Sequence, residues 1–510
     1  MKTKYFFFWL GFFAYAKQAE AESRASLPYT PSWSVRHQLQ LLVDLADLPL
    51  VTSQWPLPAA AVEQALQVLP ANLSTLFGID LQAAREAVQG ELFERTKQSH
   101  FTLQLRNRAE GLTGFDDNYT PGSAFIAATG DRRIDGDEFS FVGRTGVRLE
   151  QSSYSLRPGR SGLGPDNQYQ MRLEGTAAVV AWAGWNLQAF SHRNWWGPGW
   201  QSSLVNGTNS PAWIGIGLQR GTVQRSVSPW LEWAGPWNFD FFVARAQDPL
   251  VVPDQPQGFL FSGMRLTIKP RSWMEFGFSR VLQTGGSGRQ TGVSTLVKSL
   301  IGQNVNQEPG DPPDSSSQIA GYDLRVRCPL SWGQCAAYTQ WMGEDAAGSI
   351  PLPYKFMSLW GLERSYGYGR HRVFVEYVDT NAFSLPWDRN PKFPGYINGI
   401  YTQGFTNGGR WIGAAQGGGS QVISLGWMDA QNSRRLRFHS GKVLYGVGAG
   451  YPGVNAPNGQ LHGLSASQSL AWRGLVWTPE VSWTQLSDGQ DLGASKLKNL
   501  RLGINVRVPL

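Results

Sequence analysis

The chain has 510 residues, a formal net charge of +7, and only 16% charged residues, against roughly 25% in typical soluble domains. With 59 glycines and 22 tryptophans, this composition excludes a disordered chain, which would be highly charged and poor in aromatic residues. A helical membrane protein is excluded as well, because it needs apolar runs of roughly 18 residues and the longest run here, 5–16, has 12. The remaining class is a β-rich protein, and a transmembrane β-barrel in particular.

The first residues predict export. Lys2 and Lys4 form a positive region, residues 5–16 an apolar core, and Ala19-Glu20-Ala21 a cleavage site with small residues at both ends. These are the parts of a secretory signal peptide, which we expect to span residues 1–21. An uncleaved anchor is the alternative, but it requires a longer apolar core. Export also argues against nucleic acid as the partner of this basic chain.

Residues 22–99 predict a small α-helical bundle. Apolar residues recur at helical spacing in three stretches: Leu39, Leu42, Val43 and Ala46; Val62, Ala65, Leu66 and Leu69; Leu81, Ala84, Val88 and Leu92. Asp80 precedes the third stretch and suits a helix N-cap. This segment has 5 basic and 8 acidic residues, whereas residues 100–510 have 37 basic and 29 acidic. The opposite net charges favour a plug held partly by charge; the alternative is a bundle lying loosely in the periplasm.

From residue 100 to residue 510 the apolar period becomes two. The last strand is the clearest, since Leu500, Leu502, Ile504, Val506 and Val508 alternate with Arg501, Gly503, Asn505, Arg507 and Pro509. Segments of about ten residues that alternate in this way are typical of outer-membrane barrels. A soluble propeller also alternates, but it would show a repeat of roughly 40–50 residues, which this sequence lacks. The polar face is rich in arginine: Arg106, Arg108, Arg148, Arg172, Arg265, Arg325, Arg327, Arg435, Arg437, Arg501 and Arg507.

Connections and cysteines complete the barrel prediction. Long outer loops are expected at 111–138, 196–212, 284–319, 343–355 and 384–420, with short turns on the periplasmic side. Cys328 and Cys335 flank a short turn between two strand-like runs, and a disulfide there fits an exported protein. Two free thiols are the alternative, and the spacing does not match redox or zinc motifs.

Motifs for catalysis, metals and nucleotides are weak. Gly448, Gly450 and Gly453 match G-x-G-x-x-G, but Pro452 and Pro457 forbid the helix that would hold a pyrophosphate. His192 beside Ser191 is poor support for a hydrolase, because a catalytic triad is a spatial arrangement. The acidic stretch 131–138 lacks calcium-loop spacing and fits a solvated loop. We therefore expect no enzyme activity, no metal and no cofactor.

Two aromatic stretches are the candidate glycan-binding residues. The first is Trp195-Trp196-Gly197-Pro198-Gly199-Trp200, and the second runs from Tyr401 to Gly413 and includes Arg410 and Trp411. Trp387 and Arg389 in the predicted loop 384–420 complete the set. Tryptophan faces can stack on sugars, and arginine can bind a uronic-acid carboxylate with two hydrogen bonds. For the tryptophans the alternatives are a membrane-interface girdle or packing on neighbouring strands. For Arg410 the alternative is a loop-stiffening role.

These stretches carry a resemblance. The signal peptide, the helical segment, Trp195-Trp196-Gly197-Pro198-Gly199, Gly343-Glu344-Asp345, and Gly409-Arg410-x-x-Gly413 followed by Gly417-Gly418-Gly419 resemble the capsule assembly Wzi family in the same order. Two features depart from the pattern: Ala414 stands where a histidine is frequent, and the chain ends in Leu510 instead of an aromatic residue.

The resemblance implies an 18-stranded outer-membrane barrel with a helical bundle against its periplasmic mouth. It also implies a lectin-like protein that attaches or organises capsular polysaccharide or exopolysaccharide, and the basic chain favours an acidic polymer. The other expected partners are outer-membrane lipid or lipopolysaccharide, and the barrel-assembly machinery during biogenesis. The alternative function is a porin-like channel for anionic solutes or sugars.

Overall fold

The computed structural model describes residues 24–73, 75–107, 112–118, 122–135, 139–151, 169–226, 228–246, 256, 258–289, 292–300, 316–347, 350–383, 393–397, 401, 404–408, 410–444, 458–487 and 497–510. The predicted signal peptide lies outside these residues. Within the described ranges, no helix combines the length and apolar character needed to cross a membrane.

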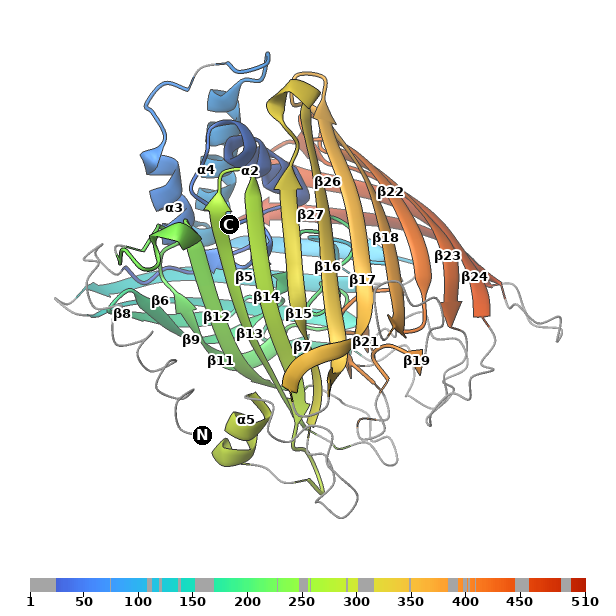
Figure 1. Cartoon of the computed structure of the whole chain (residues 1–510). Coiled ribbons are helices and arrows are strands. Elements are labelled where there is room, and N and C mark those ends of the chain that lie inside the picture. Colours follow the sequence, from blue (N-terminus) through green and yellow to red (C-terminus); the bar gives the residue numbers. More distant parts are fainter. Residues whose placement is uncertain are drawn as a thin grey trace.

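A closed antiparallel β-barrel forms most of the molecule (Figure 1). In the described residues its wall has 18 strands. In this count β7 and β8 are one strand, because both pair with β6. For the same reason β19 and β22 count as one strand beside β18, and β24 and β25 as one strand beside β26. The prediction of an antiparallel barrel of about 18 strands is confirmed.

The first half of the wall contains β4 (His100–Arg106), β5 (Gly122–Asp135), β6 (Phe139–Gln151), β7 (Tyr169–Arg172), β8 (Ala177–Trp182), β9 (Trp185–His192), β11 (Trp213–Arg220), β12 (Trp237–Arg245), β13 (Leu260–Arg271) and β14 (Met274–Thr284). The second half contains β15 (Ser316–Arg327), β16 (Gln334–Ala347), β17 (Ile350–Tyr366), β18 (His371–Phe383), β19 (Phe393–Pro394), β22 (Gln421–Asp429), β23 (Arg434–Leu444), β24 (Asn458–Gln468), β25 (Leu470–Trp472), β26 (Leu475–Ser487) and β27 (Leu497–Pro509). Pairing of β27 with β4 closes the barrel.

The alternation seen in the sequence separates the two faces of the wall. On β14, Glu275 and Ser279 point into the lumen and are buried, whereas Phe278 on the opposite face is 39% exposed. Large apolar side chains are similarly exposed on other outer faces, for example Ile216 on β11 and Leu362 on β17. An apolar outer face and a polar inner face are what a barrel in a lipid layer requires.

The two ends of the barrel differ in their connections. At one end, which we call the turn end, short turns join the strands, as at 183–184, 272–273, 367–370 and 473–474. At the other, which we call the loop end, strands are joined by the long connections 285–315 and 384–420. The helices α2 to α4 lie at the turn end and α5 at the loop end (Figure 1).

Two predicted outer loops are wrong. Residues 122–135, inside the predicted loop 111–138, form β5, and the β16–β17 ladder continues through Glu344 and Lys355 of the predicted loop 343–355. Alternation identifies a strand only where one face meets lipid. Small and charged residues occupy most positions of β5, and Gly343-Glu344-Asp345 and residues 351–355 also lack a regular apolar alternation, so both stretches look like loops.

The N-terminal segment forms β1 (Pro28–Tyr29), α2 (Trp33–Leu45), β2 (Gln54–Trp55), β3 (Leu57–Pro58), α3 (Ala59–Val68) and α4 (Leu81–Lys97). The three helices cover the apolar stretches from which the sequence predicts helices. Asp80 is the N-cap of α4, as predicted, and its carboxylate accepts a hydrogen bond of 2.9 Å from the Ala83 amide.

A disulfide joins Cys328 to Cys335 at the turn end. It spans the β15–β16 turn, in which Leu330–Trp332 form a short 3₁₀ helix. The Cys328 amide also donates a hydrogen bond of 2.8 Å to the Cys335 carbonyl. The covalent bond therefore closes a turn that the strand ladder already brings together.

Candidate functional site

The lumen is filled by two groups of segments. The turn-end plug consists of α2 and residues 46–58. The loop-end plug consists of residues 193–212 and the described residues of 393–420, which include β10 (Trp195–Trp196), β20 (Thr406–Asn407) and β21 (Arg410–Trp411). The two plugs meet inside the barrel, where β10 pairs with β2 and Trp195 lies opposite Trp55.

The first predicted glycan stretch lies within the loop-end plug. The exposed fractions of Trp195, Trp196 and Trp200 are 2%, 0% and 5%. Trp196 packs edge-on against Phe242 of the wall at a centroid distance of 5.4 Å, and Trp195 packs in the same way against Phe115. The Trp200 indole donates a hydrogen bond of 2.6 Å to Glu363 of β17.

A wall carboxylate holds the backbone of this stretch. Glu376 on β18 accepts hydrogen bonds from the amides of Trp200, Gln201 and Ser202, at 2.5, 3.0 and 2.9 Å. The Tyr338 hydroxyl donates a fourth, at 2.9 Å. Buried amide donors need partners, so Glu376 makes this turn of the plug compatible with the interior of the barrel.

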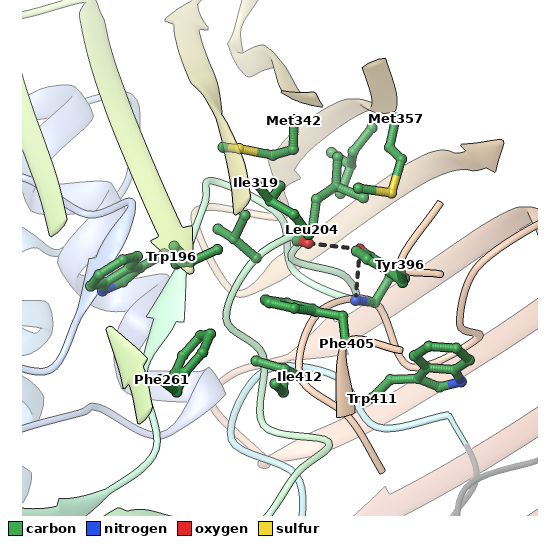
Figure 2. Packing of buried hydrophobic residues seen from close by; sticks show 14 of the residues in the cluster. Trp196, Leu204, Phe261, Ile319, Met342, Met357, Tyr396, Phe405, Trp411 and Ile412 are labelled. Carbon is green, nitrogen blue, oxygen red and sulfur yellow. Dashed lines mark hydrogen bonds between the residues drawn. The ribbon is translucent and has the colours of Figure 1, made fainter. Parts of the chain in front are cut away.

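The second predicted stretch packs against the first. Arg410 donates from Nε to the Asn209 carbonyl at 2.5 Å and from Nη2 to the Asn209 Oδ1 at 2.6 Å. Tyr396 donates from its hydroxyl to the Leu204 carbonyl at 2.7 Å and accepts from the Ala414 amide at 3.2 Å (Figure 2). Trp411 and Phe405 lie in the same apolar cluster as Trp196 and wall residues such as Phe261 (Figure 2).

Glycines within the first stretch and just after the second are required by close packing. Gly197 has a φ of +145°, and a Cβ there would lie 2.9 Å from the Gln340 amide. At Gly418 a Cβ would lie 1.8 Å from the Gly395 carbonyl oxygen, a steric overlap that excludes any larger residue. These glycines therefore have a structural role in the loop-end plug.

The structure places the predicted glycan-binding side chains in the interior. Trp195, Trp196, Trp200, Tyr401, Arg410 and Trp411 are all buried. Stacking on a sugar requires an accessible ring face, so in this conformation these residues pack the lumen and do not form an accessible glycan surface. The Tyr401 hydroxyl donates to the Gly285 carbonyl at 3.1 Å. Trp387 and Arg389 lie outside the described residues.

The turn-end plug binds the wall through polar groups that the sequence did not single out as a site. Asp44 of α2 accepts two hydrogen bonds from Arg325 of β15, at 2.9 and 2.8 Å, and Arg325 also donates to Glu363. The amides of Thr52 and Ser53 donate to Glu275 of β14 at distances of 2.7–3.0 Å. Every group in these contacts is buried or nearly so.

His37 and Arg36 extend this interface. His37 lies between the Gly369 carbonyl, at 2.6 Å from Nε2, and Arg372 of β18, which donates to Nδ1 at 2.8 Å. Burial, together with the Arg372 charge, lowers the pKa of His37 to about 3. Arg36 donates to the carbonyls of Pro198 and Gly199 at 2.9 and 2.8 Å, and thereby joins the two plugs. Its guanidinium lies over the rings of Phe115 and Trp200, at 4.4 and 4.3 Å.

Charge complementarity correctly predicted an interaction but not its location. Asp44 pairs with a wall arginine, whereas Asp47, Asp80, Glu86 and Glu94 are exposed. Glu63 and Glu91 form ion pairs with Lys97 and Arg95 of the same segment. The wall also supplies a carboxylate, Glu275, to backbone amides of the plug. Net charge does not show which carboxylates accept hydrogen bonds from backbone amides. The sequence therefore did not predict the roles of Glu275 and Glu376.

Arginines line a small cavity on the opposite side of the lumen. Its lining residues are Arg106, Asp117, Arg435, Arg437, Ser465, Ala466, Ser467, Glu480, Val481, Ser482, Arg501 and Gly503. Burial by itself would raise the pKa of Asp117, but Arg435 and Arg437 hold this pKa well below its usual range. Four arginines with two carboxylates leave this region basic.

Other tryptophans form the girdle that the sequence offered as an alternative for Trp195 and Trp196. Trp230, Trp233, Trp273, Trp332 and Trp472 lie at or beside turns of the turn end and are 45–85% exposed. Amphipathic indole rings favour the boundary between lipid and water. The same residue type thus serves the outer boundary at one place and the filled lumen at another.

The hydrolase alternative finds no support at His192. Ser191 and His192 are adjacent on β9, and adjacent strand residues point to opposite faces. His192 instead stacks on Phe190 at 4.3 Å. A nucleophile and its base need to be within hydrogen-bond reach, so these two residues do not form such a pair.

These features define a class: a transmembrane β-barrel of the outer-membrane type whose lumen is closed by segments of its own chain. Residues 97–449 match the family model described as capsule assembly protein Wzi. This match spans more than half of the sequence, and the chain belongs to that family. Family membership and the barrel place the protein in the outer membrane.

Two known proteins are similar to this chain. The structure of Wzi from Escherichia coli, described as a carbohydrate-binding β-barrel and outer-membrane protein involved in group 1 capsule assembly, matches with a TM-score of 0.71 and 20% identity, over 96% of this chain and 100% of that chain. A Klebsiella pneumoniae protein described as an uncharacterized 55.8 kDa protein in the cps region is 27% identical over 357 residues, or 68% of this chain. The match spans 64% of that relative's length. The structural similarity, at this identity, shows the shared fold.

Proposed function

We propose that this protein is a non-enzymatic, lectin-like barrel that attaches or organises an acidic capsular polysaccharide or exopolysaccharide at the cell surface. Membership of the capsule assembly Wzi family supports this function. The carbohydrate binding described for the Escherichia coli barrel of the same fold supports polysaccharide as the ligand class.

The observation that carries the proposal is the filled lumen. The turn-end plug and the loop-end plug meet at the β2–β10 pairing, and both are bound to the wall by buried contacts. A barrel filled in this way is suited to binding a polymer at its end and not to passing it through. Since long loops of such barrels face outward, the proposed binding face is the loop end, and the helices α3 and α4 face the periplasm.

The proposed contacts combine aromatic and basic side chains of the loop end. Trp387 and Arg389 remain candidates, and Arg289 is a partly exposed cation whose charge acts on buried Tyr401. In this proposal the buried Trp195, Trp196 and Arg410 support the face from below. Outer-membrane lipid or lipopolysaccharide and the barrel-assembly machinery are the further proposed partners.

A deletion strain tests the proposal by measuring polysaccharide in the cell-bound and shed fractions. We expect total polymer to be unchanged while polymer moves to the medium, and the wild-type gene to restore attachment. Complementation with W387A/R389A should restore less attachment at equal barrel abundance, and W230A, an exposed tryptophan at the other end, should restore it fully. An unchanged cell-bound fraction in the deletion strain would contradict the proposal.

The arginine-lined cavity favours a second candidate function, a channel for anionic solutes. Planar-bilayer conductance separates the two candidates, because the filled lumen predicts that the full-length protein carries little current. Large anion-selective currents in the full-length protein would favour the channel and contradict a role limited to attachment.

A further inference from the structure

Helix α5 (Val293–Leu300) lies on the outer face of the barrel at the loop end. Lumen-facing residues of β14 are odd-numbered, as Glu275 and Ser279 show, so Arg280 and Leu282 point outward. Both are nevertheless buried, at 8% and 0% exposed. Arg280 donates to the Ser299 carbonyl of α5 at 3.1 Å and also to Gln318 on the outer face of β15. The helix is thus held against the outside of the wall.

The apolar stripe of α5 is only partly covered by the barrel, unlike that expected for a helix on a water-exposed surface. At about 100° per residue, its four apolar side chains, Val293, Leu296, Val297 and Leu300, lie within one arc of about 100°. Val293 is 78% and Val297 40% exposed, whereas the buried residue of the helix is Ser299. A surface helix in water packs its apolar stripe against the protein. Here Leu296 and Leu300 are partly buried against the barrel beside Ser299, whereas Val293 and Val297, the other half of the stripe, are exposed on the outside of the wall.

The height of α5 matches one edge of the lipid layer. Exposed Trp273 marks the turn-end boundary, and Leu282 follows it by nine positions on the same chain segment. A rise of about 3.4 Å per residue and a tilt of about 40° place Leu282 about 23 Å above that boundary. The apolar band of such barrels is about 25 Å tall. Phe278, four positions before Leu282 on the same outer face, and its partner Tyr322 on β15 are exposed apolar residues of this band.

We propose that α5 is an interfacial helix that binds the lipid leaflet at the loop end. Val293, Leu296, Val297 and Leu300 contact the acyl-chain boundary, and Lys298 in the last turn reaches anionic headgroups. Such a helix would fix the depth and rotation of the barrel relative to the membrane surface. This proposal depends on the barrel fold and not on polysaccharide binding, so either can fail without the other.

Fluorescence quenching in vesicles tests this proposal. Single cysteines at V297C and, as the matched exposed control on the polar side, S294C are labelled with an environment-sensitive dye in the full-length protein, while Cys328 and Cys335 stay protected in their disulfide. The protein is reconstituted in phosphatidylethanolamine and phosphatidylglycerol vesicles. We expect nitroxide on the lipid acyl chains to quench the V297C label several-fold more than the S294C label, and aqueous iodide to show the opposite order.

Two outcomes would overturn the proposal. Equal quenching of both labels by iodide, with no quenching by the acyl-chain nitroxide, would place the stripe in water. Protection of V297C from both quenchers that disappears on dilution of the protein would indicate a second copy of the chain on this stripe. A V293D/V297D variant provides an independent readout: we expect weaker nitroxide quenching of a dye at S294C, with heat-modifiable electrophoretic mobility unchanged as proof of the folded barrel.

Discussion

The two plugs occupy one lumen but use different chemistry. The turn-end plug belongs to an N-terminal unit whose apolar core includes Leu42, Trp55 and Val62 and extends to Trp195 of the loop-end plug. It meets the wall through buried polar pairs such as Asp44 with Arg325. The loop-end plug shares one apolar cluster with the wall, in which Trp196 and Phe405 contact wall aromatics.

The turn-end plug therefore resembles a docked body, whereas the loop-end plug is an integral part of the barrel core. Removing one member of a buried polar pair weakens docking while the apolar core of each partner stays intact. Removing an aromatic residue from a shared cluster leaves a cavity in the wall's own packing. We therefore expect the turn-end plug to be released without unfolding of the barrel, and the loop-end plug to be inseparable from barrel stability.

The largest effect is expected for Trp196→Ala in the loop-end plug. Truncating a fully buried tryptophan should lower the free energy of unfolding by about 3–5 kcal/mol, measured by urea titration of the protein in vesicles. Trp230→Ala, at a residue 85% exposed, is the matched control and should change it far less. Equal effects of the two variants would show that the loop-end plug does not contribute to the core.

A smaller and more local effect is expected for Asp44→Asn in the turn-end plug. Loss of the carboxylate charge from the buried pair with Arg325 should weaken docking by about 2–3 kcal/mol, since Arg325 keeps Glu363 as a partner. Bilayer currents and proteolysis within residues 46–58 should both increase, while the urea midpoint of the barrel stays constant. Asp47→Asn changes an exposed neighbour and should do neither. A lowered midpoint in Asp44→Asn would contradict independent docking.

Acid should also release the turn-end plug. The pKa of His37 is lowered to about 3 in the docked state, where Arg372, Glu363, His371 and the Gly369 carbonyl surround it, against about 6.5 in the undocked state. A base with a lowered pKa loses stability as pH falls below its undocked pKa, at about 1.4 kcal/mol per pH unit. Docking, measured by protection from proteolysis, should therefore weaken between pH 6.5 and about pH 3.

The variant His37→Gln should flatten this pH dependence, because it removes the group that takes up the proton. His462→Gln on the outer face of β24 should retain the wild-type profile. If both variants keep the same slope, the acid sensitivity arises elsewhere in the protein.

The smallest effect is expected for Asp80→Ala. Loss of the N-cap hydrogen bond to Ala83 should destabilise the start of α4 by about 1 kcal/mol, seen as faster hydrogen exchange in its first turn. Because α4 is not part of the turn-end plug, which consists of α2 and residues 46–58, bilayer currents should stay at the wild-type level. Increased current would extend the docked interface to α4.

The barrel could be predicted from the sequence, because a strand with one apolar and one polar face shows a local alternation of apolar and polar residues. Helical spacing and the Asp80 N-cap are local in the same sense. Strand β5 lacks this signal, because small and charged residues occupy most of its positions, and it was predicted as part of a loop. Helix α5 shows the converse limit: its apolar stripe can be read from the sequence, but the sequence does not show that Val293 and Val297 of this stripe stay exposed.

The candidate site was harder to predict from the sequence than the barrel. Tryptophan suits a sugar platform, a membrane girdle and a packed interior equally well, so the sequence left all three open for Trp195, Trp196 and Trp200, and the structure packs them in the interior. Arg410 illustrates the same point, since a guanidinium binds a carboxylate or a backbone carbonyl with similar geometry. Nothing in the sequence near Glu376 indicates that its carboxylate accepts hydrogen bonds from the backbone amides of residues 200–202.

The sequence by itself therefore determined the antiparallel barrel, the helical N-terminal segment and the family resemblance, because these depend on periodicity and short motifs within one stretch of chain. Only the tertiary structure decided that the lumen is filled, which residues fill it and which face of α5 points outward. The physical reason is distance along the chain: Asp44 meets Arg325 across 281 positions and Arg36 meets Gly199 across 163. Contacts of that kind depend on the closure of the whole barrel, and no local pattern encodes them.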